Sequence, residues 1–117
     1  MKKFLIGMIC AVTLAACGSG RPEMTSFPAG GAQGQVVVKN VSATDIAGMT
    51  FEPIKANKLA DYYVRPQPQA IPAGTSATYR VPVGKYSVSG GKGFKFLIGP
   101  MTIRVNEGRT VTLTSKK

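Results

Sequence analysis

From residue 35 onward, apolar and polar residues alternate along the chain in short runs. Such alternation is typical of strands that bury one face. We predict seven strands, which cover residues 36–41, 49–52, 78–83, 85–89, 94–98, 101–105 and 110–114. Segments rich in Pro, Gly and Asn separate many of them and favour turns. Short strands at this spacing predict an all-β fold, a small antiparallel β-sandwich of about seven short strands.

The residues between the runs predict where strands end and pair. Pro53 ends the strand over residues 49–52, because proline cannot donate to a ladder. Gly90-Gly91 is a further turn. Arg104 to Leu113 forms a hairpin closed at Asn106-Glu107-Gly108, where glycine adopts a positive φ without steric penalty.

Residues 54–71 form the longest stretch without a predicted strand. Lys55 to Tyr63 predicts a short helix, with Leu59 and one of the two tyrosines on one side. Residues 65–69 are then extended, because each proline there restricts the residue before it. Loops of this length within a compact domain are uncommon and are often functional.

The first sixteen residues have the pattern of an export signal. Lys2 and Lys3 precede thirteen uncharged residues, Phe4 to Ala16. A transmembrane helix needs about 20 apolar residues, so this stretch is too short to span a bilayer comfortably. The position directly after two lysines favours a signal peptide over the alternative, a buried core helix.

The stretch Leu14-Ala15-Ala16-Cys17 resembles the lipobox of bacterial lipoproteins. The resemblance implies cleavage between Ala16 and Cys17, a diacylglyceryl group on the Cys17 thiol and acylation of the new amino group. Two or more acyl chains hold a protein firmly on a bilayer, whereas one chain binds reversibly. Gly18 after the cysteine, in place of Asp, resembles lipoproteins sorted to the outer membrane. The alternative is an ordinary signal peptide with a chance cysteine near the cut.

Cleavage there predicts three segments. They are a signal peptide over residues 1–16, a lipidated cysteine with a flexible tether over residues 17–34, and a β-sandwich over residues 35–117. Gly, Ser and Pro dominate the tether, and no apolar period appears in it. The alternative is that Met24 and Phe27 form an edge contact with the domain. Cys10 leaves with the signal, so no internal disulfide remains.

Three stretches resemble PEGA-like and transthyretin-like β-sandwich domains of bacterial surfaces. They are Ile71-Pro72-Ala73-Gly74-Thr75-Ser76, then Tyr79 with Val81-Pro82-Val83-Gly84-Lys85-Tyr86-Ser87-Val88, and Thr102 to Leu113. The resemblance implies a sandwich that binds or displays partners, with Gly84 as a turn glycine and Tyr86 as a core aromatic. It brings no catalytic residue. The Val-x-Val-Asp-Gly run that opens PEGA domains is absent from the sequence.

The composition argues against catalysis. The chain has no His, which is the side chain best suited to proton transfer near neutral pH and the commonest metal ligand. Hydroxyl nucleophiles need an activating base, and no motif supplies one. The mature chain has five carboxylates whose spacing places no two in one cleft: Glu23, Asp45, Glu52, Asp61 and Glu107. We therefore predict a non-enzyme without catalytic residue, metal or cofactor.

Basic residues outnumber acidic ones, and the net charge of +10 falls to +8 when Lys2 and Lys3 leave with the signal. A strongly basic chain favours an anionic partner. Two basic segments carry aromatic residues. The predicted ligand-binding loop contains Lys55, Lys58, Tyr62, Tyr63 and Arg65, and the second segment contains Lys92, Phe94 and Lys95. Export makes nucleic acid the least suitable anion, so we expect none. The alternative is a solvated basic surface with the aromatic rings in the core.

These features predict a lipoprotein anchored by acyl chains, such as palmitate, to the Gram-negative outer membrane and facing the periplasm. Its expected role is that of a non-enzymatic accessory or structural subunit of an envelope assembly, with an envelope protein as partner. The alternative function is a module that binds peptidoglycan or lipopolysaccharide through the basic-aromatic loop. A third role, inhibition of a cationic hydrolase such as lysozyme, is disfavoured by the net charge of +8.

Overall fold

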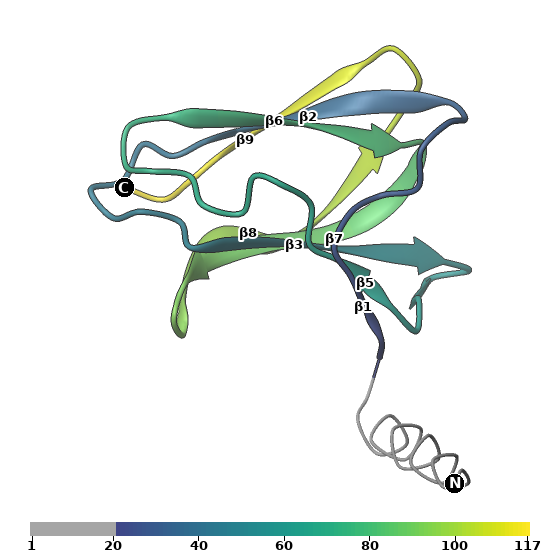
Figure 1. The fold of residues 1–117 in the computed structure, drawn as a ribbon, viewed down its shortest axis with the longest axis horizontal. Coiled ribbons are helices and arrows are strands. Elements are labelled where there is room, and N and C mark those ends of the chain that lie inside the picture. The colour runs from purple at the N-terminus through teal and green to yellow at the C-terminus, as the bar shows by residue number, and fades with distance from the viewer. Residues whose placement is uncertain (1–20) are drawn as a thin grey trace, which may run out of the picture.

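The computed structural model describes residues 21–117, so the predicted signal peptide, its cleavage site at Ala16 and the lipidated Cys17 lie outside the described residues. The described chain is all-β, and Figure 1 shows its strands in two packed layers. The predicted small β-sandwich is therefore confirmed. Within residues 21–117, no helix is long and apolar enough to cross a bilayer.

One layer is a six-stranded sheet in the order β1-β5-β3-β7-β8, with β4 paired to β3 off this path. Its strands are β1 (Glu23–Met24), β3 (Gly48–Lys55), β4 (Lys58–Leu59), β5 (Tyr63–Val64), β7 (Gly84–Lys92) and β8 (Lys95–Val105). The second layer has the order β6-β2-β9, with β6 (Ser76–Pro82), β2 (Gln33–Lys39) and β9 (Thr110–Thr114). Most pairs are antiparallel, but β1/β5 and β2/β9 are parallel, so both sheets are mixed.

The predicted hairpin from Arg104 to Leu113 is wrong. The turn after β8 exists, because the Arg109 N–H donates to the Asn106 carbonyl at 3.1 Å. However, β9 crosses to the other sheet and pairs with β2 in parallel, with Leu113 opposite Val38. Turn residues specify that the chain reverses, but not which strand receives it. Here the buried Leu113 of β9 lies beside the fully buried Val38 of β2.

Pro53 does not end its strand as predicted, since β3 continues to Lys55. The Pro53 carbonyl accepts a hydrogen bond from Ala60 N–H at 2.7 Å. Amide and carbonyl groups of one strand residue point to the same side. The backbone N–H that Pro53 lacks would therefore point to this same side of β3. On that side the partner strands β4 and β5 are interrupted between Leu59 and Tyr63.

The helix predicted for Lys55 to Tyr63 is also wrong. Ala56 and Asn57 have φ values of 53° and 62° and form a tight turn between β3 and β4, with Lys55 opposite Lys58. Positive φ at both central residues is the signature of the hairpin turn that matches strand twist, and it is incompatible with a right-handed helix. The sequence signal is weak because this turn lacks glycine.

The core lies between the two sheets, and an aromatic cluster occupies its centre. Phe51 of β3 is fully buried, with its ring centroid 5.6 Å from that of Tyr79 and 6.2 Å from that of Tyr86. Phe27 adds an edge-on contact at 5.4 Å. Tyr86 is buried, in agreement with its expected role as a core aromatic. Burial raises the pKa of both tyrosine hydroxyls to about 12.

The segment from Arg21 to Gly34, predicted as part of the flexible tether, lies on the sandwich. Strand β1 pairs with β5 through Met24 and Val64, and Phe27 packs against the aromatic cluster. Strand β2 begins at Gln33, two residues before the predicted domain boundary. The structure therefore shows the alternative edge contact. Isolated apolar residues have no period, so the sequence pattern alone did not reveal these contacts.

Candidate functional site

The five residues of the predicted ligand-binding loop do not converge on one point. Lys55 and Lys58 are exposed at the β3–β4 turn. Tyr62 is half-buried against the core and, with Lys55, lines a hollow beside Phe27. Tyr63 and Arg65 belong to a different group of contacts, which they make with Arg21 and Glu23. The loop is therefore divided between a partly apolar hollow and a charged surface.

Tyr63 and Arg65 already have partners within the described chain. Arg65 Nη1 lies 3.1 Å from Glu23 Oε2. The Arg21 guanidinium lies 5.7 Å from the centre of the Tyr63 ring, and its Nη2 lies 2.7 Å from Glu52 Oε2. Exposed ion pairs of this kind contribute about 0–1 kcal/mol to stability. Their larger effect here is to neutralise both glutamates on this surface.

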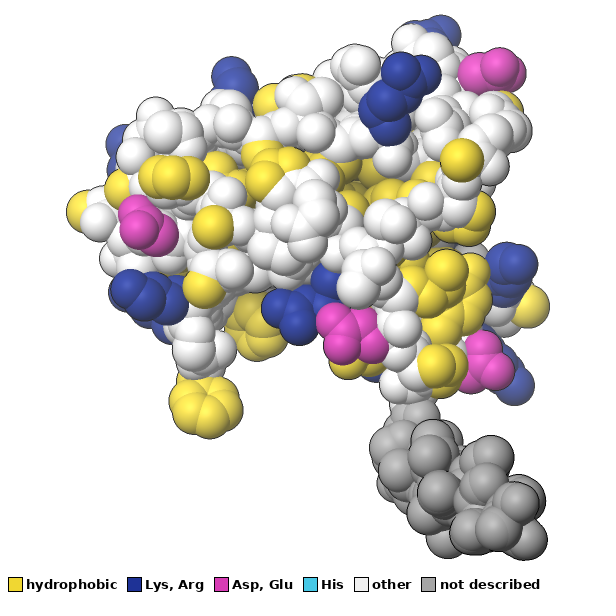
Figure 2. Space-filling view, in the orientation of Figure 1, with side chains coloured by type: hydrophobic (Ala, Val, Ile, Leu, Met, Phe, Trp, Pro, Cys, Tyr) yellow, Lys and Arg dark blue, Asp and Glu magenta, His cyan; other side chains and the backbone are white. Residues whose placement is uncertain are grey.

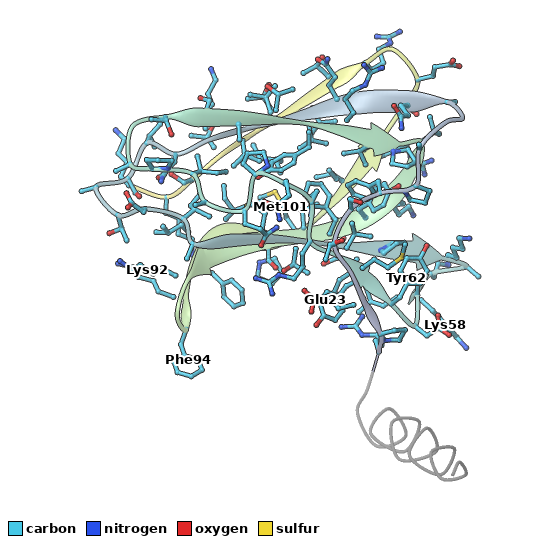
Figure 3. All side chains as sticks on the ribbon, viewed as in Figure 1. Glu23, Lys58, Tyr62, Lys92, Phe94 and Met101 are labelled. Carbon is cyan, nitrogen blue, oxygen red and sulfur yellow. The ribbon has the colours of Figure 1, made fainter. Side chains whose placement is uncertain are left out.

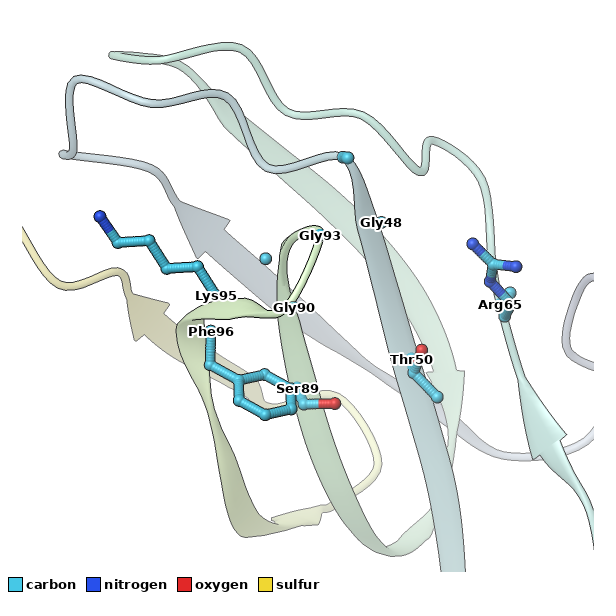
Figure 4. A pocket seen from close by; sticks show the side chains of 10 residues that line it. Gly48, Thr50, Arg65, Ser89, Gly90, Gly93, Lys95 and Phe96 are labelled. Carbon is cyan, nitrogen blue, oxygen red and sulfur yellow. The ribbon is translucent and has the colours of Figure 1, made fainter.

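A groove crosses the six-stranded sheet on this side, and Figure 4 shows its walls. Arg65 forms one wall, and Lys95 and Phe96 of β8 form the other. Its floor is made of small residues of β3 and β7, and it encloses about 270 Å³. The floor residues are Gly48, Thr50, Ser89, Gly90 and Gly91. We call this feature the Arg65–Lys95 groove.

Two glycines shape the groove floor. A Cβ added at Gly91 would overlap the Lys95 carbonyl, and one added at Gly90 would overlap the Met49 sulfur. The register between β7 and β8 shifts at these glycines. The prediction that Gly90-Gly91 is a turn is wrong, because both lie inside β7 and the chain reverses at Gly93, with φ 62°. Glycine is required here for close packing of neighbouring strands.

The groove can accept an anionic ligand that carries a ring. Two cationic residues line it, of which Arg65 is paired with Glu23. Phe96 offers a half-exposed aromatic surface, and the lining contains no carboxylate. Ser89 and Thr50 supply hydroxyl groups. Within residues 21–117, no three Asp, Glu, Cys or His side chains gather closely enough to hold a metal ion. A ligand in this groove could form ion pairs with Arg65 and Lys95 and could stack on the Phe96 ring.

The second predicted basic segment forms the tip between β7 and β8. We call residues 92–95 the Phe94 hairpin. Lys92 and Lys95 are opposite each other, and Phe94 at the tip is fully exposed. Figure 2 shows an apolar side chain standing clear of the surface at this end of the molecule, and Figure 3 shows Phe94 pointing away from the sheet. The Phe94 hairpin borders the Arg65–Lys95 groove through Lys95.

Sequence reasoning placed Arg65 and Lys95 in separate segments. The structure joins them, because β5 and β8 belong to one sheet and the small residues of β3 and β7 between them leave the surface open. Strand order in a sheet determines this proximity. The only available sequence signal was the accumulation of Gly and Ser in residues 87–91.

Comparison with protein-family models, with curated proteins and with solved structures finds no match to this chain. Inferences about its function therefore start from its own residues.

Proposed function

We propose that this chain is a lipid-anchored, non-enzymatic accessory protein of a Gram-negative envelope, attached through Cys17 to the periplasmic face of the outer membrane. The observation that carries the proposal is the lipobox-like stretch that ends at Cys17, only four positions before the described sandwich begins at Arg21. An acylated Cys17 would hold the domain directly against a membrane. Its expected partner is another protein of the same envelope.

The arrangement of carboxylates supports a role other than catalysis. Glu23 and Glu52 pair with arginines. Asp45 accepts a hydrogen bond from Ala73 N–H at 2.9 Å, which ties two loops together. A general acid or base needs an ionisable group free to face a substrate. These three carboxylates instead make structural contacts.

Cys17→Ser is expected to abolish acylation, because the serine hydroxyl is a poor substitute for the thiol that forms the thioether. The experiment labels cells with radioactive palmitate and then separates membranes from soluble fractions. We expect the wild-type chain to carry label and remain with outer membranes, and the variant to lose label and move to the soluble periplasmic fraction.

Cys10→Ser is the matched control, since it changes the other cysteine of the chain within the predicted signal peptide. We expect this control to label like the wild type. Equal palmitate incorporation in Cys17→Ser and in the wild type contradicts the anchor. Membrane attachment of an unlabelled wild-type chain contradicts it as well.

A second candidate function is binding of an anionic envelope polymer, such as peptidoglycan or lipopolysaccharide, in the Arg65–Lys95 groove. The groove supports this function because its lining contains two cationic residues and one aromatic ring and no carboxylate, and a polymer anion would compete with Glu23 for Arg65. A sugar polymer with carboxylate or phosphate groups matches this combination. Here Arg65 retains a binding role from the predicted loop, together with Lys95, which the predicted loop did not include.

Lys95→Ala is expected to weaken co-sedimentation with the polymer by about fivefold at low salt, which corresponds to about 1 kcal/mol for one charged contact. Arg109→Ala removes the same charge from an exposed residue that lies outside the groove and should leave binding nearly unchanged. The measurement is a binding isotherm across a salt series. Equal losses in both variants, or binding that does not depend on salt, would argue against the groove.

A further inference from the structure

The Phe94 hairpin and the neighbouring Phe96 expose more apolar surface than a strand connection requires. Phe94 is fully exposed and Phe96 is half-exposed, and two lysines flank the tip. Burying a phenylalanine side chain is worth about 1.5–3 kcal/mol, so exposure on this scale is unfavourable unless a partner covers it. Adjacent exposed aromatic residues are typical of interaction surfaces.

The hairpin projects to the side of the molecule from which the chain enters the domain. Figure 3 shows Phe94 and Glu23 of β1 both on the side of the molecule that is turned away from the β6-β2-β9 sheet. Only Gly18, Ser19 and Gly20 separate Cys17 from Arg21. Four steps of chain span at most about 14 Å. An acylated Cys17 therefore keeps this side of the domain close to the bilayer.

The charges on this side suit an anionic lipid surface. Glu23 of β1 and Glu52 of β3 are engaged by Arg65 and Arg21, whereas Asp61, two residues before β5, is exposed. Within the described chain, Lys92 and Lys95 form no ion pair. Cations near an anionic membrane surface contribute about 1 kcal/mol each, and aromatic residues favour the region of the headgroups.

We propose that the Phe94 hairpin is a second, non-covalent membrane contact of this chain, with Phe94 inserted among the lipid headgroups and Lys92 and Lys95 on their phosphate groups. The proposal rests on the proposed anchoring at Cys17. The hairpin alone would bind weakly, but the anchor makes its contact intramolecular and raises its effective concentration. The contact would orient the domain so that the β6-β2-β9 sheet faces away from the membrane.

The chain contains no Trp, so a single substitution provides a site-specific probe. The experiment places full-length, acylated Phe94→Trp protein in vesicles of phosphatidylethanolamine and phosphatidylglycerol, with and without brominated acyl chains. We expect blue-shifted Trp emission and quenching by the brominated lipid. Adding Lys92→Ala and Lys95→Ala to this variant should reduce the quenching, because the phosphate contacts are lost.

Thr112→Trp is the matched control, because Thr112 is exposed in β9 of the opposite sheet. Its emission should stay that of a solvated Trp, without quenching. Equal behaviour of the two probes, or an unquenched indole in acylated Phe94→Trp protein, overturns the hairpin contact and leaves the anchor standing. Emission of the Phe94→Trp variant that is shifted by an added envelope protein but not by lipid overturns it in favour of a protein partner.

Failure of the anchor gives a different result. If palmitate labelling of Cys17 fails but vesicles added to the Phe94→Trp protein still quench its indole, the hairpin contact is supported and the anchor is wrong. If labelling fails and added vesicles leave the indole unquenched, both are wrong. Circular dichroism of each variant confirms that the strands are retained.

Discussion

Phe51→Ala is expected to lower the free energy of unfolding by about 3–5 kcal/mol, which is the range for removal of a large buried aromatic side chain. Phe51 is fully buried and its ring packs edge-on against Phe27, Tyr79 and Tyr86. These contacts join both sheets and the segment before β2. Because small domains have only about 5–15 kcal/mol of net stability, this variant should be close to unfolding.

The measurement is the denaturant midpoint of the variant, followed by circular dichroism and compared with the wild type. Phe94→Ala makes the same chemical change at the exposed hairpin tip and should alter stability by no more than about 0.5 kcal/mol. A similar loss in both variants would contradict the position of the core between the sheets. A stable Phe94→Ala variant also establishes that the exposed ring is dispensable for folding.

Asn40→Asp is expected to lower the free energy of unfolding by about 3 kcal/mol or more at neutral pH, because it places an unpaired charge in a buried site. The Asn40 side-chain amide donates to the carbonyls of Ile71 at 2.8 Å and Thr44 at 2.9 Å. Its carbonyl oxygen accepts from the Ser42 hydroxyl at 2.7 Å. This buried side chain joins the loop after β2 to the loop before β6.

The effect of Asn40→Asp should depend on pH. Burial and the two facing carbonyl oxygens raise the pKa of the introduced carboxyl above its unfolded value of about 3.9. The Ser42 N–H and the Ser42 and Ser115 hydroxyls, which donate to the other oxygen, oppose this shift and reduce its size. Protonation restores one donor and removes the charge. The variant is therefore most stable below about pH 4, and it loses stability as the pH rises through the higher pKa of the folded state.

The control for this second experiment is Asn106→Asp, which makes the same substitution at an exposed turn residue. The measurement is the denaturant midpoint of each variant relative to the wild type at pH 4 and pH 7. We expect a gap between the two pH values for Asn40→Asp and almost none for Asn106→Asp. An Asn40→Asp variant that is equally stable at both pH values would mean that the buried amide donors contribute little.

Local patterns in the sequence predicted six of the nine strands of the described residues, but they divided β8 into two strands over residues 94–98 and 101–105 and missed the two-residue strands β1, β4 and β5. The alternation of Tyr79 and Val81 with polar residues places one face of β6 in the core, and the structure confirms this. The same pattern correctly assigns the buried faces of β7 and β9. These predictions succeed because a strand has a side-chain period of two, which is a property of adjacent residues alone.

The sequence by itself was enough to predict the fold class, to show that the chain has no His and to identify the lipobox-like stretch that ends at Cys17. Only the tertiary structure decided that β9 joins β2, that Phe27 packs on the core, and that Arg65 shares a groove with Lys95. The physical reason is that each of these contacts joins residues far apart in the chain. Hydrophobic burial is non-directional, so the pattern identifies which residues are buried, while the packing of the whole chain selects their neighbours.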